Sequence, residues 1–316
     1  MLEVGELKDP APGPGEVLVR LHASGVNPAD VKLRSGWLKV HEALLRIIPN
    51  CDGAGVIEAL GEGVAGSRLG ERVWVHTAKE SPNGTAAQYI ALDQALAQPL
   101  PEAMSFAEGA CVGVPIVTAH HAVLIDGPVE GQTILIAGGA GAVGHYAVQL
   151  AKQAGATVIA TVSSAEKAAH ARNGGADHII NYRDEDVAAR VLELTGGAGV
   201  ERIVEVDFGA NVAIDSQVIK PAGVIASYSS TSQPEPVLPY YPLALKGVTL
   251  RLVQAHLVSP EQRRGMLTDI ARRLADGQLR HAIGRRFPLD QIAAAHEAVE
   301  TGTVIGNVVI DIDERG

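Results

Sequence analysis

The sequence predicts an α/β protein with a doubly wound parallel sheet of the Rossmann type and a second, β-rich domain. Three observations support this fold class. Apolar strands alternate with helical patterns from Gln132 to Tyr228, which is typical of a parallel sheet. A glycine-rich loop follows the first of these strands. Short strands with dense turn signals precede them, and 316 residues are enough for two domains.

The N-terminal part of the chain has the pattern of a small, barrel-like β domain. Apolar and polar side chains alternate over residues 17–21, which predicts a half-buried strand. Strand-like runs follow at 55–60 and 72–76, with Gly, Pro and Asn between them. Residues 103–125 then predict one connecting helix.

Five buried strands are predicted in the alternating region, because their runs are apolar and β-branched. They cover residues 132–137, 157–162, 178–181, 202–206 and 223–228. Between the first two, apolar residues recur at helical spacing from Val143 to Ala154, and Gly155 suits the end of that helix. The C-terminal part predicts helices over 261–277 and 289–301 and a final strand over 307–312.

The composition argues against several classes of protein. Apolar residues make up 47% and charged residues 20% of the chain, as in a soluble globular protein. The net charge of −10 disfavours nucleic acid as a partner. Two cysteines, Cys51 and Cys111, cannot build a disulfide framework or a Cys-rich zinc site, so we expect a cytoplasmic protein. The sequence shows no signal peptide and no membrane span.

The glycine-rich loop is the motif that predicts chemistry. Gly139, Gly141 and Gly144 form G-x-G-x-x-G between a strand and a helix, the arrangement that binds dinucleotides. The N–H groups of Ala142 and Val143 would begin the helix and face the diphosphate. A glycine-rich turn of some other α/β protein is the structural alternative.

The end of the second strand of this region indicates which nucleotide binds. Sites for NAD place an acidic residue there to hold the ribose 2′-hydroxyl. Ser163 and Ser164 occupy this place, with Lys167 one turn into the next helix. These residues, together with Tyr182 after the third strand, favour the 2′-phosphate of NADPH. Glu166 is expected to face solvent; Ser164 can also cap the helix, and Lys167 and Tyr182 could be ordinary surface residues.

Longer runs of the sequence resemble a known family. They are GEVLVRLHASGVNPADVKLRSG, CDGAGVIEALGEGV, GERVWV, GTAAQYIAL, LPEAMSFAEGACVGVPIVTAHHAV and GGAGAVGHYAVQLAKQAGATVIATVSSAEK. In this order they resemble the zinc-independent, zeta-crystallin-like quinone oxidoreductases of the medium-chain dehydrogenase/reductase superfamily. The resemblance implies a GroES-like catalytic domain (1–115 and 255–316) around a central Rossmann domain (116–254). It also implies a homodimer joined through edge strands, with residues 247–254 at the interface.

The resemblance also implies roles for single residues. Asn27 and Thr118 match positions that face the nicotinamide, and Asn27 is the catalytic candidate. Asp30 and Arg34 match structural positions. The remaining cofactor positions are matched by Gly139, Gly141, Ala142, Val143, Gly144, Ser163, Ser164, Lys167, Tyr182, Asp207, Ser227 and Asn307.

Two departures from the family pattern affect substrate and nucleotide. Lys32 stands where many relatives carry a tyrosine of the quinone pocket. Gly302 aligns near an arginine that contacts the 2′-phosphate in some relatives. The first leaves the acceptor open, and the second weakens the preference for NADPH.

A catalytic zinc is not expected. In the zinc-dependent alcohol dehydrogenases, Cys, His and Cys hold the metal, and the matching positions here are Asn27-Pro28-Ala29, Cys51 and about Val114. One thiol cannot replace three ligands. The adjacent His120 and His121 point to different faces of a helix and are expected to be core or surface residues.

The sequence therefore predicts a zinc-independent oxidoreductase that transfers hydride from NADPH to a quinone-like acceptor. The cofactor carries the chemistry and the protein orients it. Two alternatives stay open: an NADPH-dependent enone or enoyl reductase, and a nucleotide-binding protein with little turnover. The expected partners are a small-molecule quinone or enone and a second copy of the chain, with no nucleic acid and no membrane.

Overall fold

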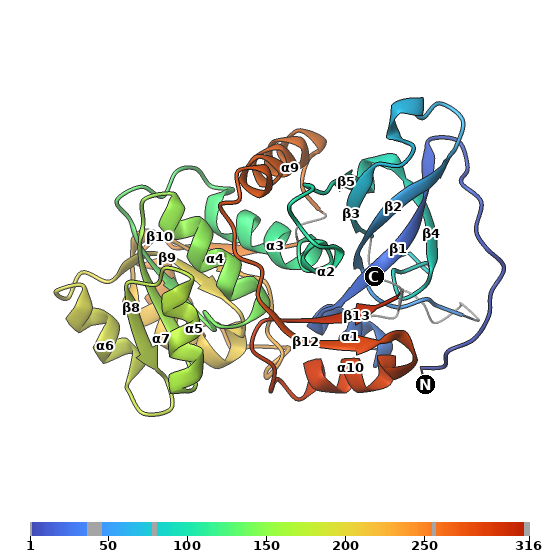
Figure 1. Cartoon of the computed structure of the whole chain (residues 1–316). Helices are drawn as coiled ribbons and strands as arrows, with labels where there is room; N and C mark the ends of the chain where they lie inside the picture. The colour runs from blue at the N-terminus through green and yellow to red at the C-terminus, as the bar shows by residue number, and fades with distance from the viewer. Residues whose placement is uncertain (1, 37–45, 78–80, 255–256, 313–316) are drawn as a thin grey trace. The chain divides into compact units, whose positions relative to one another are not determined.

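The computed structural model describes residues 2–36, 46–77, 81–254 and 257–312. The chain divides into two compact units (Figure 1): Met1–Pro115 with Thr268–Gly316, and Ile116–Leu267. The first unit is β-rich and the second contains a parallel sheet, so the predicted α/β fold class is confirmed. The boundary between Leu267 and Thr268 falls inside a continuous helix, α9 (Pro260–Ala275). The expected division at 254/255 touches residue 255, which lies outside the described residues.

The second unit is a six-stranded sheet in the order β11-β10-β9-β6-β7-β8, and every pair is parallel. Its strands are β6 (Thr133–Ile136), β7 (Thr157–Val162), β8 (His178–Asn181), β9 (Val200–Glu205), β10 (Ile219–Ser227) and β11 (Thr249–Leu252). Its helices include α4 (Ala142–Gln153), α5 (Ala165–Asn173), α6 (Val187–Leu194), α7 (Phe208–Val218) and α8 (Tyr240–Ala244). Strand order reverses between β6 and β9, which is where sheets of this kind bind ligands.

The core of this sheet explains why these segments are strands. Leu135, Ile159, Ile180, Ile203 and Ile225 come from five neighbouring strands, and each is at most 2% exposed. They pack in one cluster, and β-branched side chains suit such a buried, pleated surface. The predicted strands at 157–162 and 178–181 coincide with β7 and β8.

The first unit is a seven-stranded sheet to which both ends of the chain contribute. Its order is β12-β13-β1-β2-β3-β5, with β4 also paired to β1. The strands are β1 (Glu16–Val26), β2 (Asp52–Leu60), β3 (Arg72–His76), β4 (Tyr89–Asp93), β5 (Ala97–Pro99), β12 (Ile283–Pro288) and β13 (Asn307–Asp311). The last strand, β13, lies antiparallel beside β1 (Figure 1).

Short helices complete the first unit. They are α1 (Pro28–Arg34), α2 (Phe106–Gly109), α10 (Ile292–Glu300) and the 3₁₀ turns Gly66–Arg68, Gln94–Leu96 and Leu289–Gln291. Helix α3 (Gly113–Leu124) begins in this unit and continues in the second.

The single helix predicted over 103–125 is wrong, because the structure has α2 and α3 in its place. Pro115 lacks an N–H and is tolerated only in the first turn of a helix, so a new helix must begin shortly before it. Ser105 caps the first helix: its Oγ accepts a hydrogen bond from Glu108 N at 3.2 Å. Four strands, β4, β5, β11 and β12, were not predicted from periodicity; only the resemblance implied an edge strand in the segment of β11.

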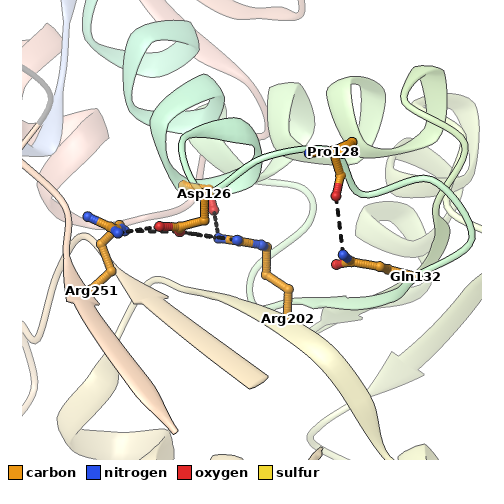
Figure 2. Close-up of polar contacts among 6 residues, drawn as sticks. Asp126, Pro128, Gln132, Arg202 and Arg251 are labelled. Carbon is orange, nitrogen blue, oxygen red and sulfur yellow. Dashed lines mark hydrogen bonds and ion pairs between the residues drawn. The ribbon is translucent and has the colours of Figure 1, made fainter. Parts of the chain in front are cut away.

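The buried Arg202 on β9 contacts the end of helix α3 and the residues directly after it. Figure 2 shows Asp126 between Arg202 on β9 and Arg251 on the edge strand β11. Arg202 is 4% exposed; its Nη1 donates to Ala122 O at 2.9 Å and to Asp126 Oδ2 at 3.1 Å. The two guanidinium groups outweigh the effect of burial and hold the pKa of Asp126 below its usual value.

Another buried carboxyl, Asp215 on α7, predicts how stability depends on pH. Its side chain is 1% exposed, and Oδ2 has no hydrogen-bond partner in the described part of the chain. Burial, and secondly Glu205, raise the pKa of Asp215 well above its ordinary value. A raised pKa in the folded state means that stability is fully present below the unfolded pKa of about 3.9 and is lost as pH rises through the folded value.

We therefore expect Asp215→Asn to raise the free energy of unfolding at pH 8 by about 1–3 kcal/mol, because the amide stays neutral whereas the buried carboxyl is driven toward ionisation as pH rises. The gain should shrink as pH falls toward 4. Denaturant unfolding at several pH values measures both effects.

Asp177→Asn is the matched control with the opposite sign. Hydrogen bonds from Lys152 Nζ and Val158 N outweigh burial and lower the pKa of Asp177, so its loss should destabilise the fold at neutral pH. A gain from Asp215→Asn that does not vary with pH would contradict this account.

Candidate functional site

The turn from β6 into α4 brings backbone so close together that side chains do not fit. A Cβ on Gly139 would lie 2.7 Å from the Cβ of Ala160, and one on Gly144 would lie 2.2 Å from Gly138 O. Gly138 has φ +68°, which favours glycine. The glycines predicted to allow a tight turn and close helix–strand packing therefore have these roles in the structure.

Thr161, near the end of β7, holds the glycine loop. Gly138 N donates to Thr161 Oγ1 at 3.1 Å and Gly139 N donates to Thr161 O at 3.0 Å. Sequence reasoning missed this residue, although a hydroxyl side chain near the end of an apolar strand is a weak signal for such a role. The bonds fix the loop relative to the second strand of the nucleotide-binding region.

The N-terminus of α4 is open to a ligand. Gly141 is exposed, and among the described residues a Cβ built there would meet only Gly138 O, at 3.4 Å. The side chains that the structure describes provide no cap for this helix, so the N–H groups of Ala142 and Val143 have no partner within it. Free N–H groups and the positive end of the helix dipole suit a diphosphate.

The C-terminal end of β7 carries small hydroxyl residues and no carboxylate. Ser163 is 8% exposed and follows the strand directly. Ser164 caps α5, because its Oγ accepts a hydrogen bond from Lys167 N at 3.2 Å. Glu166 is exposed, as expected. A 2′-phosphate therefore meets no buried acid at this position.

Tyr182 lies beside this strand end. Its backbone N donates to Val162 O at 3.0 Å, and its side chain is 52% exposed. The ring is therefore available to a ligand held at the end of β7.

The ends of β9 and β10 carry the other predicted positions. Asp207 Oδ1 accepts a hydrogen bond from Ser232 N at 3.1 Å, and Ser227 Oγ donates to Ser229 O at 3.2 Å. Glu205, which was not predicted, accepts from Asp207 N and Asn211 Nδ2. It braces the turn into α7, and burial raises its pKa.

The second unit thus brings most of the predicted cofactor residues to one edge, because parallel strands end on the same side of a sheet. Residues of this edge are Gly139, Gly141, Ala142, Val143, Gly144, Ser163, Ser164, Lys167, Tyr182, Asp207 and Ser227. Thr118 lies on α3 and is 9% exposed. Asn27 and Asn307 belong to the first unit.

Asn27 follows β1 directly and lies at the start of α1. Its side chain is 5% exposed, and Nδ2 donates to Asp52 Oδ2 at 2.7 Å. Its backbone N donates to Asp30 Oδ2 at 2.7 Å. Two buried carboxyl groups, from α1 and from β2, therefore hold the predicted catalytic residue.

Asn307 and Gly302 are the two positions of the C-terminal segment that the sequence analysis considered for the cofactor site. Val26 pairs with Val308, so Asn27 and Asn307 lie at the same end of neighbouring strands. Asn307 Nδ2 donates to Ala282 O at 2.9 Å, which is a structural contact. Gly302 has φ +62° and no side chain to offer a phosphate.

Cys51 is buried beside two carboxyl groups. Burial, and then Asp30 and Asp52, raise the pKa of the Cys51 thiol. Burial also raises the pKa of Asp30 to about 6, against hydrogen bonds from Asn27 and Cys51. Within the described ranges, no three His, Cys, Asp or Glu side chains are grouped to hold a metal.

Comparison with known proteins identifies the family. Residues 13–126 match the alcohol dehydrogenase GroES-like domain, and residues 142–272 match the family described as zinc-binding dehydrogenase. The quinone oxidoreductase of Sus scrofa is 31% identical and covers 92% of this chain and 87% of its own length. The quinone oxidoreductase of Pseudomonas aeruginosa is also 31% identical, over 98% and 95%.

Solved structures have the same fold over nearly the whole chain. A quinone oxidoreductase of Pseudomonas syringae pv. Tomato superposes with a TM-score of 0.87 at 30% identity, covering 98% of this chain and 95% of that one. A mycobacterial protein complexed with NADPH has a TM-score of 0.86 at 28% identity over the same shares. An NAD-dependent alcohol dehydrogenase reaches 0.89 at 29%, over 98% and 96%. The resemblance seen in the sequence is confirmed: the chain belongs to the zeta-crystallin-like quinone oxidoreductase family of the medium-chain dehydrogenase/reductase superfamily.

Proposed function

We propose that this protein reduces a quinone-like acceptor with hydride from NADPH and needs no zinc. One observation carries the choice of nucleotide: β7 ends in Thr161-Val162-Ser163-Ser164 with no carboxylate, beside an uncapped helix N-terminus. The quinone oxidoreductase names of the relatives support the acceptor class. The mycobacterial structure with NADPH supports the nucleotide.

Each group of residues has a defined task in this proposal. The backbone from Gly141 to Val143 holds the diphosphate, and Ser163 and Lys167 contact the 2′-phosphate. When bound, NADPH supplies the hydride, and solvent supplies the proton. Asn27 holds either the nicotinamide ribose or the acceptor carbonyl in place.

We also propose a homodimer through the edge of the cofactor sheet. Several large apolar side chains of β11, of α8 and of the residue after α8 are exposed: Leu250 (38%), Leu252 (71%), Tyr240 (65%), Tyr241 (71%) and Leu245 (85%). An exposed apolar edge strand is a template for another strand.

The proposed compartment is the cytoplasm. The two free thiols, Cys51 and Cys111, are buried and unpaired with one another, which is typical of a reducing environment. Among the described residues, no helix has the length and apolar character needed to cross a membrane.

The first test is an acceptor screen. Purified protein should oxidise NADPH in the presence of quinones, with kcat/KM for NADPH about tenfold or more above that for NADH, the value of one charge-assisted contact to the phosphate. A chelator should leave the rate unchanged. A hydroquinone product supports quinone reduction, and a saturated ketone from an enone would point to the alternative. Tight NADPH binding with no turnover on any acceptor would reduce the protein to a nucleotide-binding role.

The second test concerns the 2′-phosphate. Lys167→Ala should raise KM for NADPH roughly 10- to 100-fold, because a hydrogen bond to a charged group contributes about 1.5–3 kcal/mol. KM for NADH should not change. Ser163→Asp should shift the preference toward NADH, because its carboxylate repels the phosphate.

Arg172→Ala is the matched control, since it removes an exposed cation near the other end of α5. Equal losses with NADPH and NADH for Lys167→Ala would rule out the assigned contact.

The third test concerns the dimer. Leu250→Glu together with Leu252→Lys places charges on the proposed interface, where buried unpaired charge is strongly unfavourable. Light scattering should find a dimer for the wild type and a monomer for the double variant. Leu69→Lys, at an exposed apolar residue of the other unit (59%), should remain dimeric. A wild-type monomer at assay concentration would disprove the interface.

A further inference from the structure

Asp52, the first residue of β2, receives three hydrogen bonds on its carboxylate. Its side chain is fully buried at 0% exposure. Val114 N, at the start of α3, donates to Oδ1 at 2.9 Å and to Oδ2 at 2.8 Å. Asn27 Nδ2 donates to Oδ2 at 2.7 Å. These donors and the positive end of the helix favour the ionised form, whereas burial, and secondly Asp30, raise the pKa of Asp52.

The position of this carboxylate is tightly fixed. Thr85 Oγ1 donates to the backbone oxygen of Asp52 at 2.5 Å. On the other side, a Cβ on Gly113 would lie 2.0 Å from Asp52 Oδ1, so the carboxylate occupies the space that a side chain at 113 would need. Gly113 and Val114, the first residues of α3, therefore pack directly against the carboxylate of Asp52 and hold it in place; this contact is called the seat of Asp52 below.

A fixed carboxylate determines which way the amide of Asn27 faces. Both oxygens of Asp52 accept a hydrogen bond from Val114 N, and Oδ2 also accepts from Asn27 Nδ2, so the carboxyl group selects Nδ2 and turns Oδ1 of Asn27 away from itself. The amide torsion has two broad, nearly equivalent states in the absence of such a partner. Asp30 holds the backbone of Asn27 through its N–H but does not determine this torsion.

We infer that Asp52, seated on the N-terminus of α3, is a positioning residue that orients the Asn27 amide for hydride transfer. This inference rests on the proposed function, in which Asn27 contacts the cofactor or the acceptor. It leaves Oδ1 of Asn27 as a hydrogen-bond acceptor, which suits a hydroxyl of the nicotinamide ribose and not the carbonyl of the acceptor. It also assigns to Gly113 the role of leaving room for the carboxylate.

A double-mutant cycle tests the inference. In Asp52→Asn, the neutral amide has one acceptor oxygen and one NH₂ group in place of two acceptor oxygens, so either orientation of the Asn27 amide finds a partner and neither is selected. We expect kcat for quinone reduction to fall about tenfold or more, with KM for NADPH changed less than about twofold. In the Asn27→Ala background, the same change should cost less than about twofold, because the residue that Asp52 orients is gone.

A merely structural role gives a different result. Loss of a packing contact would lower kcat by the same factor with or without Asn27, and that outcome would overturn the inference, as would an unchanged kcat in Asp52→Asn. If the wild type oxidises NADPH but the cycle is additive, the inference fails and the proposed function stands. If the wild type is inactive with all acceptors, the proposed function itself fails.

A second variant displaces the carboxylate without changing its charge, in case Asp52→Asn does not fold. Gly113→Ala puts a Cβ into the space held by Asp52 Oδ1 and should reproduce the loss in kcat. Gly265→Ala is the matched control on α9, because a Cβ there would meet no described residue outside its own helix within 4 Å. This control should keep wild-type kcat. Full activity in Gly113→Ala would contradict the proposed seat.

Discussion

The close packing of the turn between β6 and α4 is the constraint on which the rest of the cofactor unit depends. Two positions, Gly139 and Gly144, tolerate no Cβ, because the atoms that they would meet belong to β7 and to the loop itself. This contact brings the uncapped helix end to the point where strand order reverses between β6 and β9. The ends of the other strands then fall along the same edge, and the choice of nucleotide depends on what those ends carry.

Much of the fold could be predicted from the sequence where one signal dominated. The strand at 157–162 is buried after its first residue, so its sequence is almost entirely apolar and its bounds are clear. The strand at 178–181 has its isoleucines between polar end residues, which mark its limits. β12 was missed because its sequence, IGRRFP, carries two arginines on an exposed strand. The helix predicted over 103–125 failed because composition alone favoured one helix, while Pro115 requires a fresh start just before it.

The candidate site also has features that the sequence could predict and features that it could not. The glycine loop could be predicted because its requirements are local to the backbone and glycine alone meets them. The bond between Asn27 and Asp52 could not, because these residues lie on separate elements and their contact depends on β1 pairing with β2. The roles of Ser164 and Asn307 are partly structural, as a helix cap and as a contact to Ala282. A sequence shows which groups are present but not which neighbours already engage them.

Asp126 is shared by two arginines, and this sharing restricts how the sequence can change. Neutralising Asp126 alone would leave the guanidinium of Arg202 buried with only the carbonyl of Ala122, among the described residues, and would set it beside a second cation, Arg251. Replacing Arg202 first would instead leave the carboxylate with Arg251 at the sheet edge. The three positions are therefore epistatic: a substitution tolerated at one depends on the residues at the other two, and a graft of β11 from a relative must carry its partners with it.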